Sequence, residues 1–343
     1  MNDWQPYYRD EQITLLLGDA LDQLRTLPDS SVDCIVTSPP YYGLRDYGAE
    51  GQYGLEATPA EYVETMRALF AEARRVLADD GTLWLNLGDS YSSGQGALNT
   101  DFNERWHGEG SSGQRKQEKG RPSRRRDGAE VAAARRAVTG LPPKNLLMIP
   151  ERVAMALQDD GWILRNKIVW HKTNAMPSSV NDRLSNRYEH LFLFSKAERY
   201  WFDLDPIREP HAMRPQRRPS GRPVDKIPRP GQPKQTWSTA TRNEVGVDGH
   251  PLGRNPGDVW AIPTRPYPAA HFAVFPIDLP LRCINAGCRP GGTVLDPFSG
   301  SGTTGAAARQ LGRKYVGIDL NPAYHDLAKD RFAQGVLDFD GAA

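Results

Sequence analysis

The feature that most constrains the fold is a glycine-rich loop late in the sequence. Gly300, Gly302 and Gly305 form a G-x-G-x-x-G pattern between a short apolar run and a segment of helical composition. The next apolar run ends at Asp319, where an acidic residue is suited to binding ribose hydroxyls. No lysine directly follows the glycines, which disfavours a phosphate-binding P-loop. Strand, loop, helix, strand and acid in this order predict a nucleotide-binding unit.

The position of this unit determines the order of the sheet. Residues 320–343 are too few for the remaining strand-plus-helix units of a doubly wound sheet, which take about 30 residues each. The missing strands must therefore come from earlier in the chain, and the order is circularly permuted. Topological strands 1 to 4 are then predicted over Val294–Asp296, Tyr315–Asp319, Ile13–Leu17 and Val32–Thr37. Further elements are a helix that begins at the capping box Thr58–Glu61 and strands over Thr82–Leu87, Ile163–Trp170 and Glu189–Phe194.

A second motif, Ser38-Pro39-Pro40-Tyr41, follows the strand predicted over Val32–Thr37. It stops that strand, because proline has no N–H to donate to a sheet ladder. In a doubly wound sheet, strands 1 and 4 are neighbours at the point where ligands bind. The permuted order therefore predicts that this motif and the glycine loop share one crevice, although some 260 residues separate them.

The two motifs resemble the signatures of β-group DNA amino-methyltransferases, which use S-adenosylmethionine. Ser38–Tyr41 is similar to the catalytic signature (Asp/Asn/Ser)-Pro-Pro-(Tyr/Phe/Trp), and Asp296–Thr304 is similar to the cofactor signature Asp-Pro-Phe-x-Gly-x-Gly-Thr-Thr. The segments 172–190 and 271–276 resemble two further family segments, one before the recognition domain and one over the methionine end of the cofactor. The resemblance implies an α/β, class I (Rossmann-like) methyltransferase sheet of circularly permuted motif order, with an inserted loop-rich recognition module. It also implies S-adenosylmethionine as cofactor and double-stranded DNA as partner.

The proline motif suits the methylation of an exocyclic amino group by direct displacement. Such a nitrogen is a poor nucleophile, because its lone pair is delocalised into the base. Acceptors aimed at its N–H bonds favour a pyramidal nitrogen, and the Ser38 hydroxyl and the Pro39 carbonyl supply two, held in place by the fixed φ of Pro39 and Pro40. Tyr41 offers a flat face to a base that has left the duplex. We expect Ser38, Pro39, Pro40 and Tyr41 to be catalytic residues.

The first residue of this motif bears on which base is methylated. In the family, serine is commoner in enzymes that act on N4 of cytosine, and aspartate is usual in adenine-N6 enzymes. The resemblance therefore favours a site-specific cytosine-N4 methyltransferase, with adenine N6 as the alternative. Methylation at ring carbon 5 is disfavoured, because none of the three cysteines follows a proline. A non-catalytic DNA-binding protein with a vestigial cofactor pocket, and RNA or protein glutamine as substrate, stay open as further alternatives.

Topology and resemblance together assign roles in cofactor binding. We expect Asp319 to bind the ribose hydroxyls, Asp19 to accept from the adenine amino group, and Asp296 to face the methionine ammonium or its waters. Phe298 and Phe275 are expected to pack on the adenine or methionine portions. The complete predicted set is Asp19, Phe275, Asp296, Phe298, Ser299, Gly300, Ser301, Gly302, Thr303 and Asp319.

Two basic segments interrupt these elements, although the net charge of the chain is only +1. Residues 104–136 carry a net charge of +5 and residues 206–235 a net charge of +6, which suggests a polyanion partner; a pair of solvated loops is the plainer explanation. We expect a catalytic part over residues 1–202 with a mobile basic insertion over 92–143, a recognition module over 203–262, and a cofactor-binding part over 263–343. The predicted DNA-binding residues are Arg208, Arg214, Arg217, Arg218 and Arg222.

Composition excludes several other classes of protein. No apolar run approaches the roughly 20 residues of a membrane span, and the N-terminus has no secretory pattern. Three cysteines without a C-x-x-C pair predict neither a disulfide framework nor a zinc site. We therefore expect a cytoplasmic protein with no metal and no membrane partner. The sequence does not decide whether the protein is a monomer or a homodimer. It also leaves open whether a cognate restriction endonuclease is its functional partner.

Overall fold

The computed structural model describes residues 5–44, 51–92, 141–176, 178–211, 250–265 and 275–333. The chain divides into two units, one of residues 1–203 and 258–343 and one of residues 204–257. The strands are β1 (Tyr8–Arg9), β2 (Ile13–Leu17), β3 (Val32–Thr37), β4 (Leu77–Leu87), β5 (Ile163–His171), β6 (Tyr188–Ser195), β7 (Val259–Ala261), β8 (Thr293–Asp296) and β9 (Lys314–Asp319). The helices are α1 (Ala20–Thr26), α2 (Pro59–Val76), α5 (Ile149–Asp159), the 3₁₀ turn η1 (Asp205–Ile207), α6 (Asp278–Gly287), α7 (Thr303–Gln310) and α8 (Pro322–Ala333).

The strands of the larger unit form one sheet in the order β1-β2-β9-β8-β3-β4-β6-β5-β7. The stretch β2-β9-β8-β3-β4 is parallel throughout, whereas β6 runs antiparallel to both β4 and β5. This confirms the permuted order predicted from the sequence. The strand that precedes the glycine loop, β8, lies directly beside β3, the strand that precedes Ser38, with Ile35 opposite Leu295.

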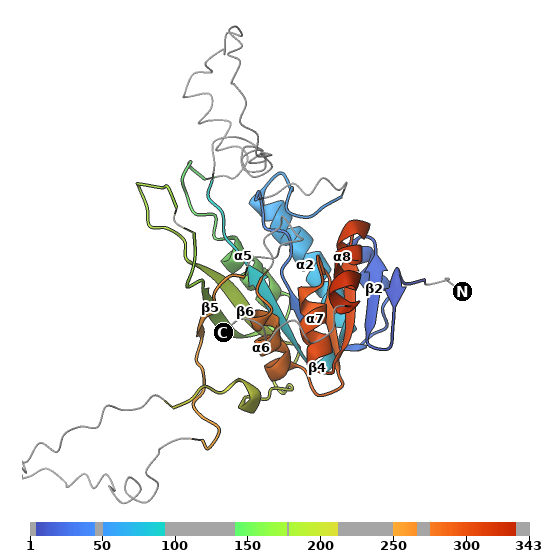
Figure 1. The fold of residues 1–343 in the computed structure, drawn as a ribbon. Helices are drawn as coiled ribbons and strands as arrows, with labels where there is room; N and C mark the ends of the chain where they lie inside the picture. The colour runs from blue at the N-terminus through green and yellow to red at the C-terminus, as the bar shows by residue number, and fades with distance from the viewer. Residues whose placement is uncertain are drawn as a thin grey trace, which may run out of the picture. The chain divides into compact units, whose positions relative to one another are not determined.

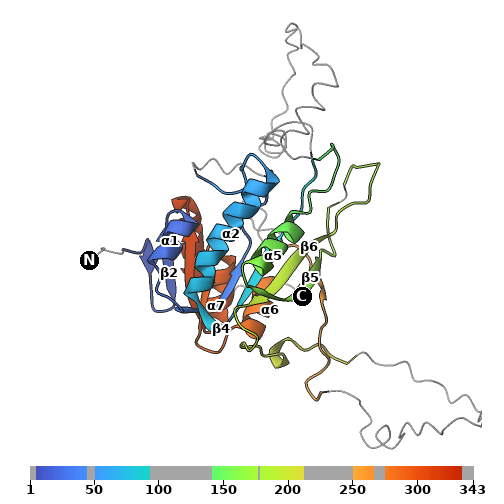
Figure 2. The same cartoon turned by 180° about the vertical axis from the view of Figure 1, so that it is seen from behind.

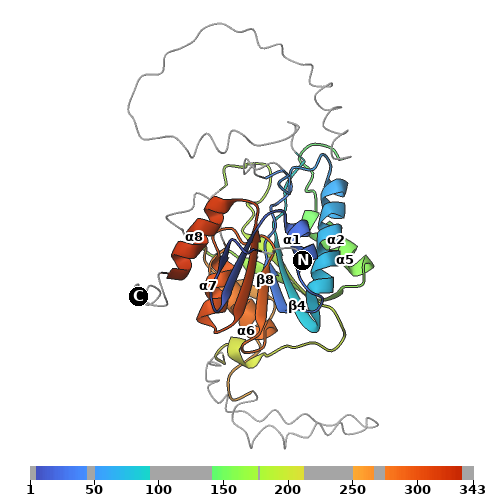
Figure 3. The same ribbon diagram turned by 90° about the vertical axis from the view of Figure 1, so that its right-hand side faces the viewer.

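Helices cover both faces of this sheet, as Figures 1 and 2 show. α6, α7 and α8 lie on one face, and α1, α2 and α5 lie on the other. Figure 3 looks along the layers and shows the sheet between the two sets of helices. The strands between them are almost continuously apolar, as expected for a parallel sheet that is buried on both faces.

Local sequence signals explain the longest helix, α2. The Thr58 hydroxyl accepts a hydrogen bond from the Glu61 backbone N–H, and Pro59 occupies the first turn. The helix ends at Val76 and β4 begins at once at Leu77, earlier than the strand predicted from Thr82. Leu77 pairs with Val32 of β3, and the ladder resumes with Cys34 opposite Thr82 after a shift in register. Residues 78–81, whose composition is that of a turn, therefore have no partner in the β3 ladder, although β4 continues through them.

The described part of the smaller unit, residues 204–211 and 250–257, is loop-rich. η1 begins it, and Glu209 and Arg254 form both a backbone bridge and an ion pair of 3.0 Å. Arg214, Arg217, Arg218 and Arg222 lie outside the described residues, as does most of the basic insertion over 92–143. Among the described helices, none is long and apolar enough to cross a membrane.

Candidate active site

A hydrogen bond joins the ends of the two strands that carry the motifs. The Thr37 hydroxyl, at the last residue of β3, donates to Asp296 Oδ1 over 2.7 Å. Asp296 ends β8, and its other oxygen accepts from the Thr304 hydroxyl in the first turn of α7 over 2.8 Å. Residues 38–41 and the glycine loop therefore leave the sheet at the same edge, from neighbouring strands.

The Asp296 carboxylate is buried, with 2% of the residue exposed, and it also accepts from the Phe298 backbone N–H. Burial raises the pKa of Asp296 to about 6, although the hydrogen bonds from Thr37 and Thr304 oppose this shift. These contacts make Asp296 a link between β3, the loop and α7. Sequence reasoning predicted a contact to the methionine ammonium and missed this internal role.

The glycine loop is tied to the Asp319 carboxylate at the end of β9. Gly300 N donates to Asp319 Oδ2 over 2.8 Å, and Asn321 N donates to Asp319 Oδ1 over 2.8 Å. Burial raises the pKa of Asp319, and these two backbone donors oppose the shift. Gly300 has a left-handed φ of 50°, and a Cβ built on it meets nothing within 4 Å. The loop is thus open at Gly300, the side from which a ligand can approach its backbone.

The other two glycines of the pattern allow close helix packing. Gly302 has a φ of 76°, and a Cβ on it would come within 2.8 Å of both Ala328 and Phe332 of α8. A Cβ on Gly305 would come within 2.6 Å of Phe332. The α7–α8 contact therefore requires glycine at both positions.

The hydroxyl side chains of the loop differ in their surroundings. Ser299 accepts from the buried Tyr315 hydroxyl over 2.9 Å, and Thr303 accepts from Arg331 of α8. Ser301 Oγ is buried and has no hydrogen-bond partner among the described residues. A buried, unpartnered hydroxyl at the N-terminal end of α7 fits a bound polar ligand, because such a group is costly to leave unsatisfied.

At the end of β2, Asp19 caps α1 by accepting from Asp22 N over 3.1 Å. Burial raises the pKa of Tyr53, and the charge of Asp19 and a hydrogen bond to Asp19 add to this shift. The Tyr53 ring meets the Phe298 ring edge-on at a centroid distance of 5.2 Å. Tyr53 thus bridges Asp19 and the glycine loop. Sequence reasoning missed it, because a lone tyrosine between two motifs carries no pattern.

Phe275 has no described contact with the glycine loop. It is half-buried and lies just ahead of α6, and the neighbouring residues 266–274 are outside the described chain. Its packing on the cofactor stays a prediction.

The Ser-Pro-Pro-Tyr turn is held from α2 and β4. Tyr62 of α2 donates to the Pro40 carbonyl over 2.9 Å. The Tyr41 ring lies over Gly88, where a Cβ would come within 2.4 Å of a ring carbon. Among the described residues, the Pro39 carbonyl accepts no hydrogen bond. The turn therefore keeps that carbonyl available as an acceptor.

The Tyr41 hydroxyl lies among three polar side chains. Ser38 Oγ is 3.3 Å away, Asn86 Oδ1 of β4 is 3.1 Å away and Glu189 Oε2 of β6 is 2.9 Å away. Glu189 in turn forms an ion pair with Lys172. Sequence reasoning named Ser38 and Tyr41 and noted a resemblance over residues 172–190, but it assigned no role to Asn86 or Glu189, which come from strands far apart in the sequence.

Arg208 is placed inside the smaller unit. Its guanidinium donates to Asp205 Oδ1 over 2.7 Å and to the Gly253 carbonyl over 3.1 Å, and its side chain is 13% exposed. The contact to DNA predicted for it stays a prediction, whereas the role in closing the loop-rich unit was missed from the sequence.

Comparison with known proteins places the chain in a family. The model of a DNA methylase family of the N6/N4 type matches residues 32–330. The chain belongs to this family of DNA amino-methyltransferases. It is 44% identical over 318 residues, 93% of this chain and 87% of the relative, to the type II methyltransferase M.XycI from Xanthomonas campestris pv. cyanopsidis. It is 42% identical, with the same coverage, to the type II methyltransferase M.Cfr9I from Citrobacter freundii.

Solved structures with the same fold include a DNA methyltransferase and a protein described as a putative DNA modification methylase. PvuII DNA methyltransferase (cytosine-N4-specific) aligns with a TM-score of 0.61 at 19% identity, over 99% of this chain and 92% of that chain. A putative DNA modification methylase from Thermus thermophilus, complexed with S-adenosyl-L-methionine, aligns with a TM-score of 0.53 at 24% identity, over 96% of this chain and 98% of that chain. These likenesses confirm the class I methyltransferase fold, and family membership makes S-adenosylmethionine the cofactor of this chain.

Proposed function

We propose that this DNA methyltransferase transfers a methyl group to the N4 amino group of cytosine in a specific duplex sequence. The observation that carries the proposal is the Thr37–Asp296–Thr304 link, which holds the Ser38–Tyr41 turn beside the glycine loop. A methyl donor over Gly300 and a base amino group at Ser38 would then meet at one edge of the sheet. The choice of cytosine rests on serine at the first position of the turn, and the neighbour described as cytosine-N4-specific shares only the fold.

S-Adenosylmethionine supplies an electrophilic methyl group when bound. We assign its adenosine to the surface formed by Asp19, Phe298 and Asp319, and its methionine end to the loop that contains Ser301. Asp319 keeps acceptor capacity for ribose hydroxyls, because its carboxylate has about four lone-pair sites and accepts from three backbone N–H groups, those of Gly300, Leu320 and Asn321. Phe275 keeps its proposed place against the adenine or methionine portion, and Asp296 keeps its proposed place near the methionine ammonium or its waters. For Asp296 this place is secondary to its bonds with Thr37 and Thr304.

The turn residues act on the base. Ser38 Oγ and the Pro39 carbonyl accept the two N–H bonds of the amino group, which concentrates its lone pair on the nitrogen. The Tyr41 ring offers a stacking face to the extruded base, and Gly88 leaves room for that ring. The proton leaves only after the nitrogen has attacked, so the reaction needs no strong general base.

The smaller unit, residues 204–257, and its flanks correspond to the recognition module in this proposal. We assign phosphate or base contacts to Arg208, Arg214, Arg217, Arg218 and Arg222. A protein that binds through such cations loses affinity steeply as salt rises, because it releases counterions from the phosphate backbone. DNA affinity that is equal at low and high salt would contradict this assignment.

The product identifies the reaction. Duplex DNA methylated by the purified protein is digested to nucleosides, and the modified nucleoside is identified by mass. The proposal expects N4-methyldeoxycytidine. N6-methyldeoxyadenosine would establish adenine as the target base. The Ser38–Tyr41 turn would then act on the N6 amino group of adenine. Sequencing that reports the modified base in its context would give the target site at the same time.

A further inference from the structure

We propose that Glu189 is a positioning residue that fixes the Ser38 hydroxyl as a hydrogen-bond acceptor for the target amino group. It acts through Tyr41. The proposal rests on the proposed function in one respect: it requires the amino group of the target base to lie beside the Ser38 hydroxyl. It concerns a carboxylate on β6 that lies outside the proline motif and the glycine loop, at the end of the segment 172–190 that also resembles the family.

The chemistry of the three groups around the Tyr41 hydroxyl sets the direction of their hydrogen bonds. Glu189 is a carboxylate and only accepts. The side-chain amide of Asn86 donates from Nδ2 to the His190 carbonyl over 3.1 Å, so its Oδ1, an acceptor, is the atom that faces Tyr41. Asn86 and Glu189 therefore cannot donate to Tyr41. The single hydrogen of the Tyr41 hydroxyl must be donated to one of these two acceptors.

Between these two acceptors, the carboxylate is favoured. Glu189 Oε2 lies at 2.9 Å and Asn86 Oδ1 at 3.1 Å from the Tyr41 oxygen, and a charged acceptor makes the stronger bond. With its hydrogen turned toward Glu189, the Tyr41 oxygen presents a lone pair to Ser38. The contact of 3.3 Å between Ser38 and Tyr41 is then one in which Ser38 donates.

Glu189 is itself held in place by charge and by register. Its side chain is 16% exposed and pairs with Lys172, whose side chain is 23% exposed. The Lys172 ammonium lies 4.6 Å from the centroid of the Trp170 ring, and Trp170 is directly opposite Glu189 in the β5–β6 ladder. These neighbouring side chains thus fix the carboxylate at the point where β6 passes the turn.

The consequence is a directed chain of hydrogen bonds from Ser38 to Tyr41 to Glu189. A serine hydroxyl can donate or accept, and a serine that donated toward the base would repel its N–H groups. With its hydrogen committed to Tyr41, Ser38 offers only lone pairs to the base. The neutral Ser38 hydroxyl thereby acts only as an acceptor toward the base. A carboxylate at the same position would need no such assistance, because it has no hydrogen to donate.

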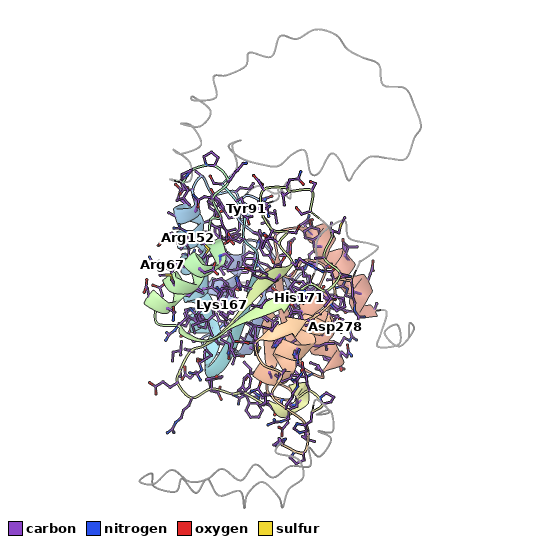
Figure 4. The ribbon with its side chains drawn as sticks, turned by 90° about the vertical axis from the view of Figure 1, so that its left-hand side faces the viewer. Arg67, Tyr91, Arg152, Lys167, His171 and Asp278 are labelled. Carbon is purple, nitrogen blue, oxygen red and sulfur yellow. The ribbon has the colours of Figure 1, made fainter. Side chains whose placement is uncertain are left out.

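The test compares Glu189→Gln with a matched control, Glu151→Gln. Glu151 of α5 is also a partly buried acid that is paired with a lysine, Lys167. Lys167 is labelled on β5 in Figure 4. Glu151 makes no described contact with Tyr41. The rate of methyl transfer is measured in a single turnover with labelled S-adenosylmethionine and saturating DNA. The dissociation constant for S-adenosylmethionine and the thermal midpoint are measured for the same variants.

We expect Glu189→Gln to slow the single turnover about 10- to 100-fold, with an unchanged dissociation constant for the cofactor and a thermal midpoint close to that of Glu151→Gln. Glu151→Gln keeps the wild-type rate. A wild-type rate in Glu189→Gln would overturn the proposal. A loss of rate that is matched by lost cofactor affinity or a lower midpoint would also overturn it, because the role would then be structural.

A double-mutant cycle with Tyr41→Phe tests the path. Phenylalanine keeps the ring and removes the hydroxyl through which Glu189 acts. If the groups form one chain, the double variant is no slower than the slower single variant. Losses that multiply would show that Glu189 acts independently of Tyr41 and would contradict the proposal. Methylation of adenine by the wild type would contradict the proposal that cytosine is the target. The double-mutant cycle would still show whether Glu189 and Tyr41 are coupled.

Discussion

The two sides of the site are built from different parts of the chain. On the proposed cofactor side, backbone conformation shapes the loop after β8: the Gly300 N–H donates to the Asp319 carboxylate, and Gly302 lets α7 approach α8. On the proposed base side, the turn after β3 is held by side chains from other strands, among them Asn86 and Glu189. A backbone-built site is visible in the spacing of a few neighbouring residues. A side-chain-built site depends on residues that only the fold brings together.

The largest effect is expected where backbone shape is essential, at Gly302. In Gly302→Ala, the left-handed φ and the overlap with Ala328 and Phe332 each cost free energy, so we expect a loss of about 2–5 kcal/mol in unfolding free energy. Affinity for S-adenosylmethionine should fall at least about 100-fold, as calorimetry would measure. Gly312→Ala is the control, because Gly312 also has a left-handed φ, of 67°, but open space around it. Equal losses in the two variants would contradict the packing argument.

The next effect is expected at Asp296, which joins the two sides. Burial raises the pKa of Asp296 to about 6 from an ordinary value of 3.8. The group therefore contributes most to stability when it is protonated, and this contribution is lost as pH rises from about 4 to about 6. The shift corresponds to roughly 2–3 kcal/mol.

Asp296→Asn removes this titration. Denaturant unfolding of wild type and variant across that range should show a larger cost of the substitution at about pH 4.5 than at about pH 8. A cost that does not change with pH would show that the carboxyl group titrates normally.

A smaller effect, confined to the base side, is expected at Gly88. A methyl group in Gly88→Ala overlaps the Tyr41 ring and must displace it. We expect the single-turnover rate to fall about 10-fold, whereas cofactor affinity stays at the wild-type value. A fall in cofactor affinity of similar size would mean that the two sides are not separable in this way.

The smallest effect is expected at Lys172. Lys172→Met removes the charge that pairs with Glu189 and keeps much of the apolar stem near Trp170. Because the pair is partly exposed and Asn86 also faces Tyr41, we expect about a threefold lower rate and an unchanged product. A loss as large as that of Glu189→Gln would assign the lysine a direct role at the base.

The difference between the backbone-built loop after β8 and the side-chain-built turn after β3 explains which features the sequence could predict. The glycine spacing, the acid at the end of β9 and the proline turn predicted the strand order β2-β9-β8-β3 and the meeting of the two strand ends. They gave β4 no place in this order. The internal bonds of Asp296, the bridge made by Tyr53 and the Glu189–Tyr41 contact were not predicted. The Thr37–Asp296 bond and the Glu189–Tyr41 contact join residues that lie far apart in the sequence, and Tyr53 belongs to no motif. The Asp296–Thr304 bond lies within one motif, but spacing alone does not show which side chains bond. The pairing of β6 with β4 sets the place of Glu189.

The central claim is that the ends of β3 and β8 form one site for the methyl donor and the base. A crystal structure with sinefungin, in which an amine-bearing carbon replaces the methylated sulfur, tests it most directly. The account predicts adenosine at Asp19 and Asp319, with the amine directed toward Ser38 and the Pro39 carbonyl. An analogue bound with its amine facing away from Ser38, or bound at a different edge of the sheet, would contradict it.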